Sequence, residues 1–385
     1  MKNKVIVSVV IIVLFFFYVF RASYTPTNKH YATSLNKIEQ SVLDSNYNSD
    51  KLELGTLNNK FQVKIKSGDL CTDYDIDTAL SDIDKLGLNT INIPVAINIS
   101  SLTASDMEIV DYSKDRAIQL IKKLKGKKIN LILEAYPWIK NGSMDEREWL
   151  PQNMNDFFYN WKSKVLKPLI DDIAVPYNVE ALNIGAGFDK IESEEEPFCE
   201  MVDYVRSYYK GLVTYRTSWW KTADWNDPAT KKLQDDLKLA YEKKLNNKLF
   251  SKLDFISIAA YFELTENKTN TVDNLVKALQ STQITNRKQN VKQEIKNFYT
   301  KWNKPIFFGE LGFPPTENAS LSPWDTHETQ KPDGKEQANC FQAYKTVFEN
   351  EQWNLGFSIF AIGNKGPSNH YYPSDYSIDV IKSWY

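Results

Sequence analysis

The strongest constraint on the fold is an alternation that runs from residue 61 to the end of the chain. Short apolar runs of strand length alternate with longer segments of helical period, which is typical of repeated βα units around a parallel sheet. Eight runs are predicted as strands: Phe61–Ile65, Thr90–Ala96, Ile129–Ala135, Val179–Ile184, Leu212–Tyr215, Phe255–Ala260, Pro305–Phe308 and Leu355–Ala361. The predicted helices between them are Ile76–Leu86, Lys114–Leu124, Asn155–Ile173, Cys199–Tyr209, Thr230–Leu249, Val272–Trp302 and Glu336–Asn350. This count favours a (β/α)8 TIM barrel, an α/β fold, over an open doubly wound sheet.

Composition excludes several classes of function. The 47 basic and 49 acidic side chains give a formal charge of −2, which offers no basic surface to a nucleic acid. The three cysteines form no CxxC pair, and the three histidines have no metal-ligand spacing. No GxGxxG motif or P-loop follows any predicted strand. We therefore expect no metal, no nucleotide cofactor and no nucleic-acid partner.

The N-terminus resembles an export signal. Lys2 and Lys4 precede an apolar run, Val5–Phe20, which Arg21 closes. At ~1.5 Å per residue the run spans about 24 Å, which suffices for the ~30 Å hydrocarbon core if the flanking charges snorkel. The run lacks the small-x-small site at which a secretory signal peptide is cleaved. It therefore predicts an uncleaved transmembrane signal anchor.

Three regions follow from this interpretation. Residues 1–22 form the signal anchor, residues 23–59 a polar stalk, and residues 60–385 the barrel. The basic N-terminal end remains cytoplasmic, which places the barrel on the extracellular face of the plasma membrane. If the segment were cleaved, the barrel would be secreted.

Functional residues of such a barrel follow the strands, at their C-terminal ends. Here carboxyl groups occur among aromatic residues, which suggests a sugar site. Aromatic rings stack on pyranose C–H faces, and a pair of carboxyl groups can perform acid/base and nucleophilic work at a glycosidic bond. The candidate catalytic residues are Glu310, Glu134 and Asp189. The candidate substrate-binding residues are Tyr136, Trp138, Asn183, Arg216, Trp219, Trp220 and Tyr261.

Several segments resemble a known family. Lys304–Phe313 is similar to the strand-seven signature of the clan of retaining glycoside hydrolases whose catalytic carboxylates follow strands four and seven. More narrowly, Asn183–Gly185, Tyr208–Tyr215 and Asp254–Tyr261 resemble the family 113 β-mannanase-like glycosidases. The resemblance covers the chain from about Phe61 onward, and it implies that Glu310 is the nucleophile.

One position departs from the family pattern. The acid/base glutamate that the resemblance implies, two residues after Gly185, is replaced by Gly187. A retaining mechanism needs a second carboxyl group, for which Glu134, Asp189 and Glu192 are the candidates. Glu192 is interpreted, with its acidic neighbours, as part of a solvated first helical turn.

Two hypotheses follow. In the first, the chain is a membrane-anchored glycoside hydrolase that acts on a surface or exported polysaccharide or oligosaccharide, or transfers the sugar to an acceptor. In the second, it is a catalytically impaired carbohydrate-binding protein in wall or exopolysaccharide assembly. Glu310 favours the first and Gly187 the second. Arg216 either binds a substrate group or pairs with a neighbouring glutamate, and the aromatic residues are either ligand platforms or packing residues.

Overall fold

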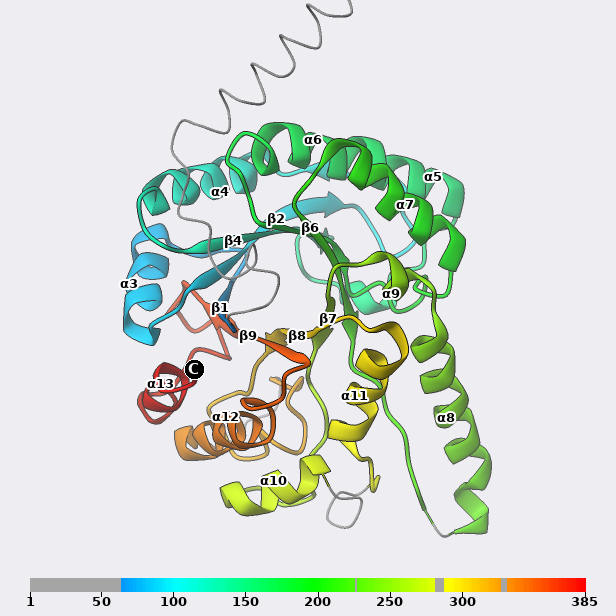
Figure 1. Ribbon diagram of the computed structural model, residues 1–385, viewed down its shortest axis with the longest axis vertical. Helices are drawn as coiled ribbons and strands as arrows, with labels where there is room; N and C mark the ends of the chain where they lie inside the picture. The colour runs from blue at the N-terminus through cyan, green and yellow to red at the C-terminus, as the bar shows by residue number, and fades with distance from the viewer. Residues whose placement is uncertain (1–63, 226, 281–286, 327–330) are drawn as a thin grey trace, which may run out of the picture. The chain divides into compact units, whose positions relative to one another are not determined.

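The computed structural model describes residues 64–225, 227–280, 287–326 and 331–385 (Figure 1). The predicted signal anchor and stalk lie outside these residues. Within the described ranges, no helix combines the length and the apolar character needed to cross a bilayer.

Eight parallel strands form a closed barrel. They are β1 (Ile65–Leu70), β2 (Thr90–Ile99), β4 (Asn130–Ile139), β5 (Ala181–Ala186), β6 (Leu212–Ser218), β7 (Ile256–Ala259), β8 (Ile306–Leu311) and β9 (Asn354–Ile362). Each strand pairs with the next in this order, and β1 pairs with both β2 and β9, which closes the sheet. The short β3 (Glu108–Ile109) is antiparallel to β2. The predicted (β/α)8 fold is confirmed.

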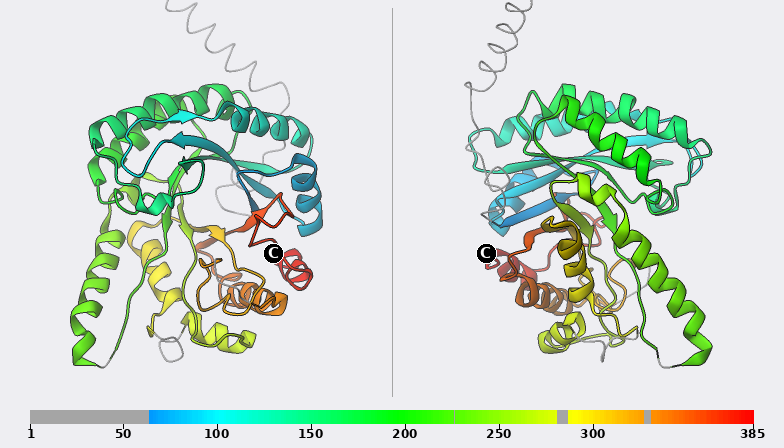
Figure 2. Two further views of the ribbon diagram at one scale, coloured as in Figure 1. Left: turned by 180° about the vertical axis from the view of Figure 1, so that it is seen from behind. Right: turned by 45° about the vertical axis from the view of Figure 1, so that its right-hand side comes forward.

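Helices surround the barrel and follow its strands (Figures 1 and 2). They are α3 (Ile76–Leu86), α4 (Asp111–Leu124), α5 (Met154–Asn160), α6 (Lys167–Leu169), α7 (Glu195–Tyr208), α8 (Lys231–Asn246), α9 (Leu249–Lys252), α10 (Val272–Gln280), α11 (Val291–Trp302), α12 (Gly334–Phe348) and α13 (Asp375–Lys382). Two π-helical segments, η3 (Trp161–Leu166) and η4 (Ile170–Ala174), flank α6, and two 3-10 turns are η2 (Glu146–Glu148) and η5 (Pro228–Thr230). The α3 helix matches its predicted bounds because Asp75 caps its first turn and Gly87, with φ of 63°, ends it.

Two predicted elements differ from the structure, and one helix was not predicted. The first strand was predicted at 61–65, but β1 occupies Ile65–Leu70, whose polar residues do not form an apolar run. The helix predicted over Val272–Trp302 is two helices, α10 and α11. The C-terminal α13 was not predicted at all, and it packs against α3 and α12.

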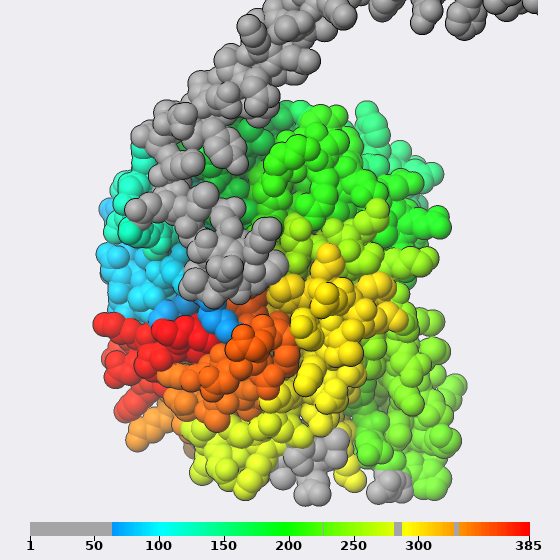
Figure 3. All heavy atoms as spheres, in the orientation of Figure 1, coloured from blue at the N-terminus to red at the C-terminus, as the bar shows by residue number. Residues whose placement is uncertain are grey.

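The side chains inside the barrel form layers. Near the strand starts, a separate apolar cluster fills the barrel: Ile65, Ile132, Ala181, Phe255, Phe307 and Leu355. Above it, the Ser67 hydroxyl donates to the Asn92 side-chain oxygen at 3.1 Å. Charged side chains lie further along the strands, near their C-terminal ends. The barrel is therefore a packed core with a polar end. Figure 3 shows the first and last described segments side by side on one face, as the β1–β9 pairing requires.

Candidate active site

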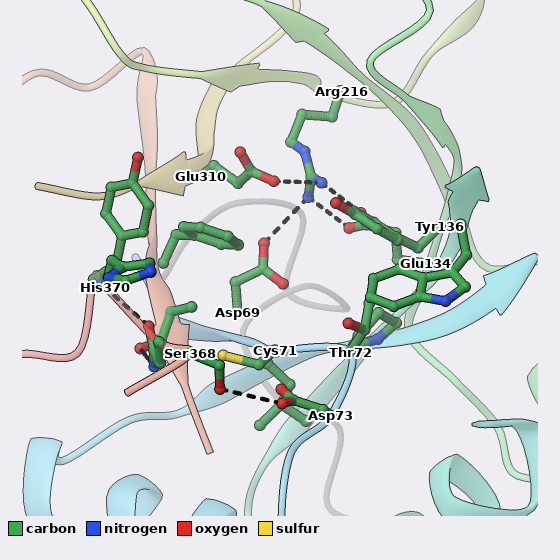
Figure 4. A pocket seen from close by; sticks show the side chains of 17 residues that line it. Asp69, Cys71, Thr72, Asp73, Glu134, Tyr136, Arg216, Glu310, Ser368 and His370 are labelled. Carbon is green, nitrogen blue, oxygen red and sulfur yellow. Dashed lines mark hydrogen bonds and ion pairs between the residues drawn. The ribbon is translucent and has the colours of Figure 1, made fainter. Parts of the chain in front are cut away.

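One arginine joins three carboxyl groups at the C-terminal end of the barrel. Arg216 of β6 holds both oxygens of Glu134 from β4, with one contact at 2.6 Å. Its guanidinium also lies 2.6 Å from the carboxylate of Glu310 on β8 and 3.2 Å from that of Asp69 on β1 (Figure 4). Four strands thus bring these side chains to one point, because parallel strands of a closed barrel end on the same rim.

A glycine precedes Glu310 at a crowded point of the barrel interior. A Cβ atom at Gly309 would lie 1.9 Å from the Ser257 hydroxyl and 3.1 Å from Cδ of Arg216. The residue before Glu310 therefore has to lack a side chain, chiefly because the Ser257 side chain of β7 occupies that space.

Charge and burial determine the protonation of this cluster. Burial raises the pKa of Glu134, and the nearby Arg216 charge opposes the rise. Burial and the Glu134 charge raise the pKa of Asp69 well above its ordinary value. Burial acts to lower the pKa of Arg216, but Glu134, Glu310 and Asp69 outweigh it and hold that pKa well above its usual range. The guanidinium therefore stays charged.

Glu310 is the most accessible of the three acids. Its side chain is 13% exposed, against 1% for Glu134 and 4% for Asp69. All three line a cavity of about 350 Å³, shown in Figure 4. Its other lining residues include Cys71, Thr72, Pro94, Tyr136, Trp138, Phe360, His370 and Tyr371. Among these carboxylates, Glu310 is the one that a bound molecule can best reach.

Aromatic side chains line the cavity and extend beyond it. Tyr136 and Trp138 lie on its wall with ring centroids 6.4 Å apart. Tyr261 contacts Trp219 edge-on at 5.2 Å, and Trp219 stacks on Trp324 at 5.6 Å. Four of the aromatic residues predicted to bind substrate thus lie in or beside the cavity.

Two other predicted binding residues lie in different surroundings. Trp220 is 6% exposed and packs against Tyr241 and Phe298, with its indole N–H donated to Glu294. Asn183 is buried and hydrogen-bonds Glu134. Trp220 is therefore placed as a core residue, and Asn183 as a neighbour that orients Glu134.

The two acids that follow β5 face another part of the barrel rim. Asp189 is exposed, and its carboxyl hydrogen-bonds Ser218. Glu192 is 5% exposed and lies 2.6 Å from the Lys244 ammonium, while the Thr217 hydroxyl donates to it at 2.7 Å. The expectation of a solvated Glu192 was wrong, because β6 and α8 cover it and supply its partners; only Glu195 and Glu196 lie in the first turn of α7.

A glutamate that the sequence analysis missed occupies the space beside Gly187. A Cβ atom at Gly187 would lie 2.3 Å from Cγ of Glu146, which belongs to the η2 turn after β4. Gly187 also has φ of 68°, a conformation that favours glycine. The Glu146 charge is the largest influence on the Tyr136 hydroxyl, and it raises the pKa of that hydroxyl.

Some of the residues at the site that were not predicted could have been found from a sequence pattern, and others could not. Asp69 escaped notice because the first strand was predicted too early. His370 and Tyr371 follow β9, so the rule that sites lie beyond strand ends applies to them as well. Glu146 lies in an acidic loop with no motif, and only the folded chain brings it to Gly187.

A (β/α)8 barrel with accessible and buried carboxylates among aromatic side chains at its C-terminal rim supplies the groups that an O-glycosyl hydrolase uses. A family model, Glycoside Hydrolase Family 113, matches residues 138–374. The chain belongs to this family.

Solved structures share the fold at low sequence identity. A GH113 β-1,4-mannanase has 18% identity and a TM-score of 0.60, covering 83% of this chain and 98% of that one. The GH113 β-mannanase AaManA from Alicyclobacillus acidocaldarius has 15% identity and a TM-score of 0.62, covering 86% and 97%. A β-glucuronidase from Ruminococcus gnavus has 12% identity and a TM-score of 0.52, covering 84% of this chain and 50% of the other. No curated protein matches the sequence.

Proposed function

We propose that this chain is a retaining glycoside hydrolase that cleaves β-mannosidic bonds in a cell-surface or exported polysaccharide, with Glu310 as its nucleophile. The observation that carries the proposal is the position of Glu310: partly exposed on the cavity and paired with Arg216 at 2.6 Å. The guanidinium fixes the Glu310 carboxylate in one orientation and compensates its charge, while the exposed part of the carboxylate faces the cavity. Family membership and the mannanase neighbours support the choice of a mannoside.

The proposed chemistry has two steps. The Glu310 carboxylate attacks the anomeric carbon while a second carboxyl group protonates the leaving oxygen. Water then displaces Glu310 from the glycosyl-enzyme, and the anomeric configuration is retained. Glu134 is engaged through both oxygens by Arg216, and Asp189 is exposed beside Ser218. The two contacts with Arg216 make Glu134 a weaker choice for the second carboxyl than the sequence suggested. Asp189 does not line the cavity that holds Glu310.

The proposed setting is the outer face of the plasma membrane. The support is in the sequence: Lys2 and Lys4, the apolar run Val5–Phe20, and Arg21. Full-length protein should then remain in the membrane fraction after alkaline carbonate, and protease added to whole cells should digest its barrel. Recovery of the chain in the carbonate supernatant would contradict anchoring without bearing on catalysis.

A second candidate is a carbohydrate-binding protein without catalysis. Gly187 favours it, because the residue that the family resemblance makes the acid/base has no side chain here. The two candidates predict the same glycan binding and differ in turnover.

Reducing-end release separates them. The full chain in detergent is incubated with mannan, glucan, chitin-type and host surface polysaccharides, with Glu310→Gln as the test variant. Glu317→Gln serves as the control, since Glu317 lies in the same connection beyond β8. The proposal expects release from mannan that is lost only in Glu310→Gln. Mannan binding without release by the parent would establish the binding protein instead.

A further inference from the structure

Glu146 fills the space that a side chain at Gly187 would need. Its Cγ atom lies 2.3 Å, and its Oε1 atom 3.2 Å, from an ideal Cβ at that glycine. Gly187 directly follows β5, so Glu146 brings a carboxyl group to the end of β5 from a different segment of the chain.

The turn that carries Glu146 is firmly anchored. Trp149, immediately after η2, is fully buried and donates its indole N–H to the Ala104 carbonyl at 2.9 Å. Its ring meets the ring of Phe188 at 5.7 Å, and Phe188 is the neighbour of Gly187. At the other end of the turn, the Asp145 carboxylate accepts the Arg147 backbone N–H at 3.0 Å. The contact between Glu146 and Gly187 is therefore held by the core and by a cap.

The surroundings of Glu146 suit a group that carries a proton near neutral pH. Burial raises its pKa to about 7; its own backbone N–H opposes the rise, and the Asp145 and Glu310 charges reinforce it. The adjacent Arg147 pairs with Asp145 at 2.5 Å. Among the described residues no cation forms an ion pair with Glu146, whereas Arg216 engages Glu134 through both oxygens.

Two observations relate Glu146 to the cavity. The Glu310 charge acts on Glu146, and both carboxylates act on the hydroxyl of Tyr136, which lines the cavity wall. Besides these, the groups acting on Glu146 are Asp145 and Arg147 of its own loop. Glu146 is partly exposed, and it lies beside Gly187 at the end of β5, on the rim to which the cavity opens.

We infer that Glu146 is the general acid/base of the retaining hydrolysis that we propose above, on which this assignment rests. In the first step the Glu146 O–H gives its proton to the glycosidic oxygen. The bond from C1 to that oxygen breaks, and a Glu310 oxygen forms a new bond to C1. In the second step the Glu146 carboxylate takes a proton from water as the water oxygen bonds C1, and the bond between C1 and Glu310 breaks. Both carboxyl groups return to their starting states.

Azide rescue tests the assignment. The full chain acts on β-1,4-mannan, whose leaving sugar needs a proton, and on 2,4-dinitrophenyl β-mannobioside, whose leaving group needs none. Glu146→Ala should lose about 10²- to 10⁴-fold in turnover of mannan. With the dinitrophenyl substrate it should give one burst of dinitrophenol per enzyme, followed by slow turnover. Azide should accelerate that turnover and yield the β-mannobiosyl azide.

The matched control is Glu148→Ala in the same turn. Glu148 is exposed and pairs with Lys190 at 3.1 Å, so its loss should leave both reactions at the parental rate. Glu146→Gln keeps the side-chain volume and should lose mannan turnover to the same extent as Glu146→Ala, with an unchanged melting temperature.

Three results would overturn the assignment. Parental mannan turnover by Glu146→Ala would remove Glu146 and leave the proposed hydrolase standing. Azide rescue in Glu134→Ala or Asp189→Ala would assign the role to that residue. Inactivity of the parent on both substrates, matched by Glu310→Gln, would refute the proposed hydrolase and this assignment with it.

Discussion

The guanidinium of Arg216 lies 2.6 Å from the carboxylate of Glu310, on the strand that lies two positions away in the barrel. The same guanidinium also contacts Glu134 and Asp69, so three acids share one buried cation. The charge balance of the site therefore depends on the Arg216 side chain, and its removal should change the stability of the fold.

Arg216→Met should be strongly destabilising. Removing one partner of a buried ion pair costs about 3–5 kcal/mol, because the remaining charge is left without compensation. The pKa values of Asp69 and Glu134 are already raised and would rise further, so both acids would be neutral at low pH. The loss should therefore be small at pH 4 and grow as the pH rises.

Urea denaturation of Arg216→Met and the parent at pH 4 and pH 8 measures this effect. Lys252→Met is the control: Lys252 pairs with Asp203 on the surface, with the two side chains 41% and 59% exposed. A surface pair contributes about 0–1 kcal/mol. Equal destabilisation by the two variants at pH 8 would contradict the buried-cation account.

The pH profile of hydrolysis should have an alkaline limb near pH 7. The acid must be protonated when the glycosidic bond breaks, and the Glu146 pKa of about 7 places loss of that proton there. Asp145→Asn should move the limb to lower pH, since the Asp145 charge raises the Glu146 pKa and the variant also frees Arg147. The profile of kcat/KM on mannan shows the shift; a limb that moves upward or stays fixed would argue against Glu146.

Gly187→Glu should not restore a conventional site. The left-handed backbone costs a non-glycine residue about 1–3 kcal/mol, and the new Cβ would meet Glu146 at 2.3 Å. Adding Glu146→Ala should recover part of the loss, because it removes the atoms in contact. Chemical denaturation of the two single variants and the double variant gives the coupling free energy between the two positions. Strictly additive changes in the free energy of unfolding would show that the two side chains do not compete for space.

Two adjacent tryptophans should behave differently. Trp219 stacks on Trp324 beside the cavity, so Trp219→Ala should raise KM for mannan about tenfold, the equivalent of ~1.4 kcal/mol of lost binding. Trp220 is buried, so Trp220→Ala should cost about 3–5 kcal/mol of stability. Kinetics and thermal unfolding of both variants check this. A KM effect confined to Trp220→Ala would exchange their roles.

The barrel was predictable because its strands are apolar and its helices amphipathic, two periods that can be recognised in a single sequence. Asp69 escaped prediction since polar side chains occupy the inside of β1. The Glu310 prediction depended on local sequence around β8. Glu146 could not be predicted, since its proximity to Gly187 depends on how Trp149 and Phe188 pack, a contact between segments about forty residues apart.

The most direct test of the central claim is to trap the glycosyl-enzyme. The full chain is incubated with a 2-deoxy-2-fluoro-β-mannosyl fluoride, which forms the covalent intermediate and slows its hydrolysis, and the digested protein is analysed by mass spectrometry. The account predicts one fluoromannosyl group on the peptide that contains Glu310, with no label in Glu310→Gln. Label on Glu134, Glu146 or Asp189, or an unlabelled parent that nonetheless hydrolyses mannan, would contradict it.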